Sequence, residues 1–192
     1  PGVKAEYFVG FDMDKDPILV RTEKSPNISW EFNKTPDSIL FEPNYFSVRF
    51  SGNIIVMESG NYKINVNGID GLKFSFEGNE LIDKMSENYS HTTFKTDYLI
   101  KRKAYPYILE YFEDEGWGEV RLGISEIKEG LIDDAISKAA SSDLVLMVMG
   151  TYDYLESEGR DRKNTDLPLD QKNLLKKKEM DLRKMKIMIL SF

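Results

Sequence analysis

The sequence predicts an α+β protein, in which an antiparallel β-sandwich is followed by a partial parallel α/β sandwich unit. Of the 23 aromatic residues, 20 precede residue 126. Short segments before that point alternate apolar and polar residues, which is the pattern of half-buried strands. After it, helical spacing and continuous apolar runs indicate a parallel α/β fold. We therefore predict two domains, residues 1–125 and 126–192.

Five segments of the first domain have an apolar residue at every second position. Successive side chains of a strand point to opposite faces, so each segment presents one face to a core and the other to water. Polar clusters that contain Gly separate the segments and predict turns. Short strands at this spacing are typical of a β-sandwich. The predicted strands are 46–50, 62–66, 72–76, 105–111 and 120–124, and the predicted turns are 58–61, 77–79 and 114–116.

The second domain predicts the order helix, strand, helix, strand. Apolar residues recur at helical spacing over 130–141, and the apolar run 144–149 predicts a strand covered on both faces. After a polar loop, a helix is expected from Leu167 to about Met180, followed by a buried strand at 187–190. Two central strands cannot cover their own edges. We therefore expect the last strand to be frayed or shielded by a second copy, which makes a homo-oligomer through this sheet edge possible.

Composition excludes several functional classes. The net charge of -7 and the pI near 4.9 disfavour nucleic acid and anionic membranes as partners. The chain has no Cys and one His, His91, which excludes thiolate chemistry, Cys-based zinc sites and multi-His metal sites. The longest apolar run has six residues, too few for a membrane helix. We expect no cofactor and no metal.

The first domain resembles the protective-antigen-type β-sandwich module, a lectin-like domain found in toxins, adhesins and carbohydrate-active enzymes. The resemblance implies a module that lies over an active-site mouth and binds or admits glycan. Because the chain begins at Pro1, we expect a piece of a longer protein, and the resemblance favours a secreted or periplasmic one. The matching residues are 3–8, 46–52, 59–62, 68–72, 77–78, 81–83, 110–113 and 120–123.

The second domain resembles the opening of the α/β sandwich domain of glycoside hydrolase family 3, the β-glucosidase family. The matching segments are 143–150, 155–162 and 166–171. The resemblance implies a retaining β-glucosidase acting on β-linked glucosides or short glycans, with Glu158 as the acid/base. It places the nucleophile, an Asp, on a barrel domain that is missing from this chain. We therefore expect the isolated chain to be inactive.

The loop after Met149 is also where physical reasoning alone predicts a functional residue, because ligands of open α/β sheets bind beyond the carboxyl ends of strands. Glu156 and Glu158 lie in this loop. A retaining glycosidase needs two carboxyl groups about 5 to 5.5 Å apart, one of them protonated near neutral pH. The alternative interpretation is a solvated, ion-paired loop without a chemical role.

Exposed aromatic rings are the expected sugar contacts of the β-sandwich, since a ring face offers apolar area at little conformational cost. Trp117, between two glycines on a predicted turn, is the first candidate, followed by Tyr89 and Phe94. The alternative for each ring is a place in the core. Some sugar-binding relatives hold calcium with two adjacent acids, but Ile69 stands where the first would be, so we interpret Asp70 as a turn former that accepts backbone hydrogen bonds.

Two other functions were weighed against the enzyme fragment. Residues 2–125 could form a free-standing carbohydrate-binding or adhesive module. Nucleotide binding by the second domain is disfavoured, because the single glycine after the strand, Gly150, fits neither the dinucleotide fingerprint nor the phosphate loop.

Overall fold

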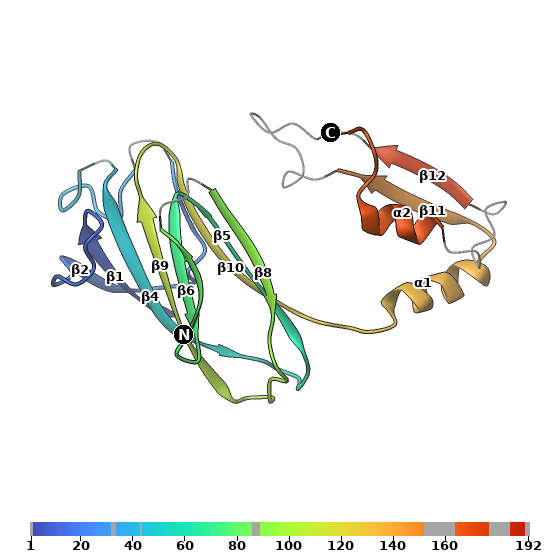
Figure 1. The fold of residues 1–192 in the computed structure, drawn as a ribbon, viewed down its shortest axis with the longest axis horizontal. Coiled ribbons are helices and arrows are strands. Elements are labelled where there is room, and N and C mark those ends of the chain that lie inside the picture. Colours follow the sequence, from blue (N-terminus) through green and yellow to red (C-terminus); the bar gives the residue numbers. More distant parts are fainter. Residues whose placement is uncertain are drawn as a thin grey trace. The chain divides into compact units, whose positions relative to one another are not determined.

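The structure is a computed structural model that describes residues 2–31, 34–42, 44–85, 89–151, 164–176 and 185–190, with side chains for all of these except 89–91, 170 and 185–190. The chain divides into two compact units, residues 1–127 and 128–192. The first unit is the β-sandwich and the second contains helices and strands (Figure 1). No described helix is long and apolar enough to cross a membrane.

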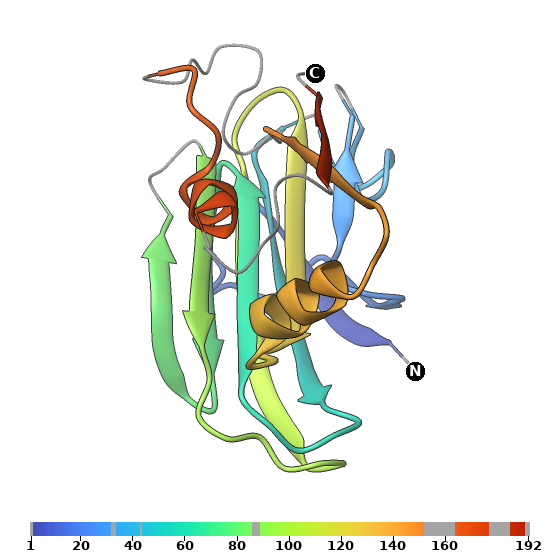
Figure 2. The same ribbon diagram turned by 90° about the vertical axis from the view of Figure 1, so that its right-hand side faces the viewer.

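The first unit packs a six-stranded antiparallel sheet against a four-stranded one, and Figure 2 shows the strands of both sheets running along the length of this unit. The larger sheet has the order β2-β1-β4-β9-β6-β7, and the smaller one β3-β10-β5-β8. The strands of the larger sheet are β1 (Val3–Val9), β2 (Leu19–Glu23), β4 (Phe46–Ile55), β6 (Gly71–Phe76), β7 (Asn79–Lys84) and β9 (Ala104–Glu113). Those of the smaller sheet are β3 (Ile28–Trp30), β5 (Tyr62–Ile69), β8 (Tyr89–Lys95) and β10 (Gly118–Glu126).

The core lies between the two sheets and is rich in aromatic rings. On β4, Phe46, Val48 and Phe50 are fully buried, as the alternation of that segment predicts. Leu109 on β9 and Ile64 on β5 are fully buried as well. All five strands predicted from the alternation are confirmed, and together they form the centre of the sandwich.

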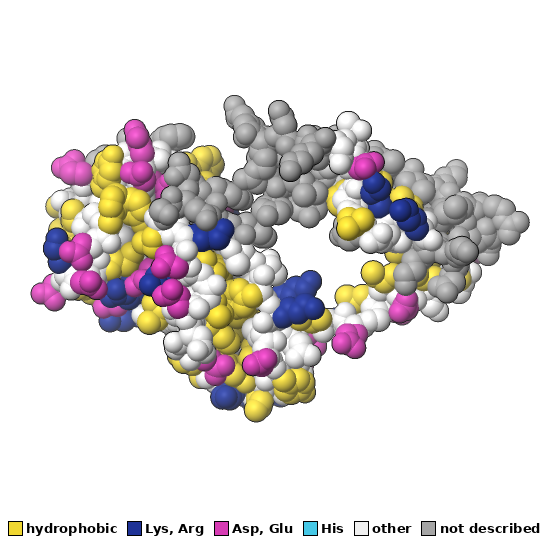
Figure 3. Space-filling model, viewed as in Figure 1, with side chains coloured by type: hydrophobic (Ala, Val, Ile, Leu, Met, Phe, Trp, Pro, Cys, Tyr) yellow, Lys and Arg dark blue, Asp and Glu magenta, His cyan; other side chains and the backbone are white. Residues whose placement is uncertain are grey.

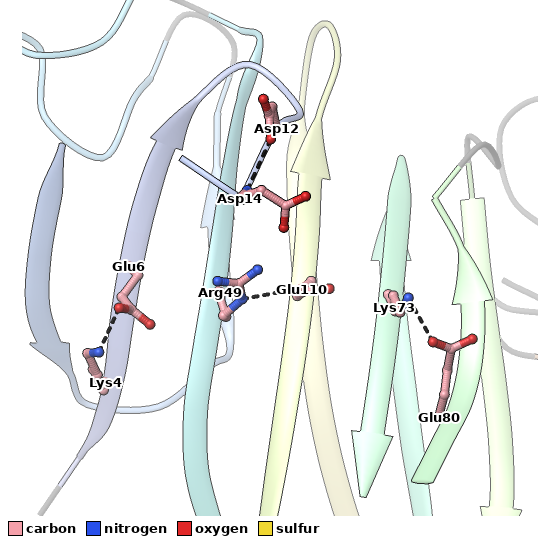
Figure 4. Close-up of polar contacts among 8 residues, drawn as sticks. All are labelled: Lys4, Glu6, Asp12, Asp14, Arg49, Lys73, Glu80 and Glu110. Carbon is pink, nitrogen blue, oxygen red and sulfur yellow. Dashed lines mark hydrogen bonds and ion pairs between the residues drawn. The ribbon is translucent and has the colours of Figure 1, made fainter. Parts of the chain in front are cut away.

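The outer face of the six-stranded sheet carries a row of charges in register across neighbouring strands (Figure 4). Arg49 on β4 lies opposite Glu6 on β1 and Glu110 on β9, and its Nε is 2.6 Å from a Glu110 carboxylate oxygen. Lys73 on β6 follows in the same row and pairs with Glu80 at 2.7 Å. Opposite charges on adjacent strands stabilise the pairing. We refer to this row of ion-paired side chains on the outer face as the charge ladder.

The second unit contains α1 (Leu131–Ala140), β11 (Val145–Gly150), α2 (Leu169–Leu175) and β12 (Met185–Leu190). β11 and β12 pair in parallel, with Val145 opposite Met185. The prediction that the first of these strands is covered on both faces is wrong within this chain, because Leu146 and Val148 are exposed. The second helix begins at Leu169, two residues later than predicted, because Pro168 caps its start. The assignment of this unit to an α/β sandwich domain stays a prediction.

Candidate functional site

Trp117 lies on the tight turn that joins β9 to β10, as predicted, and its side chain is 48% exposed. Its indole Nε1 donates a hydrogen bond to the hydroxyl of Ser29 at 2.7 Å. Ser29 is on β3, which pairs with β10 through Trp30 opposite Gly118. This bond holds the polar edge of the indole against the sheet and leaves about half of the side chain accessible to a ligand.

Neighbouring loops fix the turn that carries Trp117. The N–H of Gly116 donates to the side-chain oxygen of Asn44 at 3.2 Å, and the N–H of Tyr45 donates to the Asp114 carbonyl at 3.4 Å. Asn44 and Tyr45 both adopt positive φ angles, 68° and 54°, which are rare for residues with side chains. Such backbone conformations persist where the surroundings enforce them. The turn and the 44–45 segment therefore form one braced structure.

Two further exposed aromatic rings lie at the same end of the sandwich. Tyr45 precedes β4 and is 54% exposed, and Phe11 follows β1 and is 52% exposed. Their ring centroids are 6.0 Å apart. Neither residue could be predicted from the sequence, since neither lies in an alternating segment or between glycines. We refer to Phe11, Tyr45 and Trp117 as the aromatic end.

Two buried carboxyl groups, Asp70 and Glu113, lie beneath the turn. Asp70 forms the corner between β5 and β6 with a φ of 70°, and its carboxylate accepts the Asp114 N–H at 3.3 Å. The prediction that Asp70 forms a turn and accepts a backbone hydrogen bond is confirmed. Glu113, at the end of β9, is 2% exposed and Asp70 is 9% exposed. The Tyr111 hydroxyl donates to Glu113 at 2.6 Å and accepts the Glu119 N–H at 3.1 Å.

Both carboxyl groups have pKa values raised above the ordinary range, mainly by burial. Burial and the neighbouring charge of Asp70 together raise the pKa of Glu113 to about 7, against the lowering effect of the hydrogen bond from Tyr111. Burial also raises the pKa of Asp70, assisted by the charge of Asp114. The pKa of the Tyr111 hydroxyl is raised by burial and by its hydrogen bond to Glu113. Near neutral pH, the Glu113 carboxyl is therefore the group that retains a proton.

This carboxyl pair supports the turn and cannot contact a ligand, because both side chains are buried. The packing around Glu113 is tight: a Cβ added to Gly118 would clash with the Glu113 carboxyl and the Tyr111 hydroxyl. Trp30 stacks on the Tyr111 ring with their centroids 5.6 Å apart. In the described part of the chain, no group of three or more His, Cys, Asp or Glu is arranged to hold a metal ion.

The structure separates the remaining predicted site residues. Tyr89 is opposite Ile69 on β5, at the same end of the sandwich as Trp117, but its side chain lies outside the described part. Phe94 is at the opposite end of β8, next to Lys95, which pairs with Lys63. Glu156 and Glu158 lie outside the described residues.

The fold is similar to several solved structures. A β-glucosidase from Kluyveromyces marxianus matches 98% of this chain and 24% of its own, with 21% identity and a TM-score of 0.71. The same enzyme in complex with glucose matches 99% of this chain and 23% of its own, with 22% identity and a TM-score of 0.63. An anti-sigma factor domain-containing protein from Clostridium clariflavum matches 66% of this chain and 42% of its own, with 28% identity and a TM-score of 0.58.

The chain thus spans about a quarter of the length of the β-glucosidase that it resembles. No curated protein matches it. The family model of the PA14 domain matches residues 1–136, which include the whole β-sandwich and the turn that carries Trp117. The predicted resemblance of the first region to the protective-antigen-type module is thereby confirmed, and the chain belongs to the PA14 domain family.

Proposed function

We propose that this chain is part of a retaining β-glucosidase, in which the β-sandwich binds glycan at the mouth of the active site through the aromatic end. The observation that carries the proposal is the likeness to the K. marxianus β-glucosidase, which extends over 98–99% of this chain and so includes both units in the same order. The similarity of residues 143–171 to family 3 glycoside hydrolases supports it from the sequence.

The aromatic end suits carbohydrate. The apolar C–H face of a pyranose ring packs on an aromatic ring, whereas the hydroxyl groups need polar partners at the edge. Trp117 is braced by its bond to Ser29 and by the turn beneath it, so little conformational entropy is lost when a sugar stacks on it. Tyr45 adds a second exposed ring with a hydroxyl group.

Glu158 is the proposed acid/base of the parent enzyme. It follows β11 in the sequence, and the loop beyond the carboxyl end of a parallel strand is where such sheets bind ligands. A retaining glycosidase also needs a nucleophilic carboxylate about 5 to 5.5 Å away. In our proposal that carboxylate belongs to the missing barrel domain. The isolated chain should then release no aglycone from an aryl β-glucoside.

A titration of the ¹⁵N-labelled chain with cellobiose tests the binding half of the proposal. We expect amide shifts at 114–118 and about tenfold weaker binding by Trp117→Ala, because one sugar–aromatic contact contributes about 1 to 1.5 kcal/mol. Tyr98→Ala is the matched control, since Tyr98 is an exposed aromatic at the other end of the sandwich. Unchanged affinity of Trp117→Ala would overturn this role.

Hydrolysis assays test the catalytic half. Activity of the pure chain on an aryl β-glucoside, lost on Glu158→Gln, would contradict the assignment of the nucleophile to another domain. In a longer chain that includes a barrel, Glu158→Gln should lower kcat by a factor of at least about 100, the contribution typical of a general acid.

A free-standing carbohydrate-binding module is the second candidate. It is favoured by the likeness of the β-sandwich to a chain that is named for an anti-sigma factor domain and not as a glycosidase. Glycan-array binding by the isolated chain, together with a parent gene that encodes no barrel, would select this candidate over the first.

A further inference from the structure

A second candidate site lies at the end of the β-sandwich opposite Trp117. Here a cavity of about 170 Å³ is lined by residues of the β6–β7 turn and of the end of β8. β7 is the edge strand of the six-stranded sheet and β8 is the edge strand of the four-stranded sheet. The cavity therefore lies where the two sheets of the sandwich are open at their sides, and among the described strands only β6, β7 and β8 contribute to its lining.

The apolar lining of this groove is rigid. Phe94 packs against the core, with its ring centroid 5.5 Å from that of Phe74 at a tilt of 39°. Phe76 is buried and stacks on Tyr105 with a centroid distance of 6.0 Å. Leu81 on β7 adds a half-exposed aliphatic side chain. A ligand therefore meets aromatic rings that the core already holds in place.

The polar lining carries acceptors that are unused within the described residues. Glu77 comes from the β6–β7 turn, Asn79 from the start of β7 and Asp97 from the segment after β8. We find no hydrogen bond or ion pair between their side chains and any other described residue. The turn itself is held in place, since the Glu77 N–H donates to the Pro106 carbonyl at 2.9 Å. Lys95 and Thr96 also line the cavity, so the two carboxylates and one ammonium group leave a net negative charge, which disfavours phosphate and other anions.

The size of the groove limits what it can hold. Its volume is about 170 Å³. Pockets for drug-sized ligands start at about 300 Å³. The groove therefore has room for one small ring, with any further part of the ligand outside in solvent.

We propose that this groove is a second carbohydrate subsite, which takes a single neutral pyranose unit. Phe94 and the half-exposed Leu81 offer apolar area to the C–H groups of the sugar, and the oxygens of Glu77, Asn79 and Asp97 accept hydrogen bonds from its hydroxyl groups. The subsite is independent of Trp117, because the two lie at opposite ends of the strands. It goes beyond the proposed function and does not rest on the glycosidase assignment.

A titration of the full ¹⁵N-labelled chain with methyl β-D-glucopyranoside tests the subsite. We expect amide shifts at 77–79 and 94–97 that persist in Trp117→Ala. Asn79→Ala should weaken binding by a factor of about 2 to 10, the value of one net hydrogen bond. Phe94→Ala should weaken it by about tenfold or more. Tyr98→Ala, which replaces an exposed ring outside the lining of the groove, should bind as the parent chain does.

The outcomes separate this inference from the proposed function. Shifts confined to 114–118 would overturn the groove and leave the aromatic end in place. Shifts confined to the groove would support the subsite and contradict the role of Trp117. Phe94→Ala could fail to fold because it removes a core contact, so Asn79→Ala, at the exposed start of β7, decides alone in that case. Full affinity of a folded Asn79→Ala chain, or tighter binding of a cationic amine or a peptide than of the glucoside, would overturn the proposal.

Discussion

Glu113 is an acidic residue at a position of β9 where the alternation of apolar and polar residues predicts an apolar side chain. The alternation of the segment 105–111, continued by one step, points position 113 toward the core, and the structure buries it there. A carboxyl group in the core needs partners. Tyr111 and Asp70 supply them, and Asp70 comes from another strand connection that sequence reasoning could not bring next to Glu113.

The raised pKa of Glu113 makes the stability of the β-sandwich depend on pH. Its folded-state pKa is about 7 against an ordinary value of 4.5, so the folded state binds the proton more tightly than the unfolded chain. The contribution of this group to the free energy of unfolding is then most favourable below about pH 4.5 and is lost as the pH rises to about 7. The slope is at most about 1.4 kcal/mol per pH unit.

Glu113→Gln should remove this slope. We expect the parent chain to lose unfolding free energy relative to the variant between pH 5 and pH 7. Urea denaturation at each pH measures this difference. Glu115→Gln, a change of an exposed carboxylate on the same turn, is the control. A parent chain that gained stability relative to Glu113→Gln over this interval would contradict the raised pKa of Glu113.

At the scale of elements, the strands that alternation missed are mainly the edges of the two sheets. β2, β3, β7 and β8 are the four edge strands, and none of them shows a sustained apolar face. An edge strand has one neighbour and often avoids apolar repeats, which would promote association. Period-two patterning therefore identifies central strands and overlooks edge strands. This is why the groove between β7 and β8 could not be anticipated, although Phe94 was singled out.

The charge ladder on the six-stranded sheet is a second property of elements (Figure 4). Acidic and basic side chains are interspersed over the face of the sandwich seen in Figure 3, in keeping with this pairing. The Arg49–Glu110 pair joins the central strands β4 and β9, and both side chains are mostly buried. The Arg49 guanidinium also lies 5.4 Å from the centroid of the Phe8 ring.

A double-mutant cycle can measure this pair. We expect Arg49→Met and Glu110→Gln to show a coupling of about 0.5 to 1 kcal/mol in thermal or urea unfolding. The Lys101–Glu58 pair, which is longer at 3.2 Å and more exposed, is the control and should couple more weakly. Equal coupling in the two cycles would show that strand register and burial do not increase the coupling free energy of the Arg49–Glu110 pair.

At the scale of the whole molecule, the two units differ in how well they bury their own apolar surface. The β-sandwich encloses a continuous core, whereas β11 leaves Leu146 and Val148 exposed beside its single described partner strand, β12. Two paired strands that leave one apolar face exposed are marginally stable. This difference agrees with our proposal that the second unit is completed by further residues of a parent enzyme or by a second copy.

Hydrogen exchange can test this difference. In a dilute monomer, amides of β11 and β12 should exchange much faster than those of β4 and β9, which open only on global unfolding. If a second copy covers the sheet, raising the protein concentration should slow exchange in β11 and β12 and leave β4 and β9 unchanged. Strong protection of residues 187–190 in a dilute monomer would contradict the view that this sheet is incomplete.

From the sequence alone we could predict five central strands of the β-sandwich, the turn that carries Trp117 and the turn role of Asp70. These features follow from local rules: apolar alternation, glycines beside a turn, and the preference of Asp for such corners. Folding places Phe11 and Tyr45 at the same end of the sandwich as Trp117, brings Asp70 close enough to Glu113 to affect its pKa, and assigns Phe94 to a separate groove. Each of these depends on contacts between segments far apart in the chain, and such contacts leave no periodic signal in the sequence.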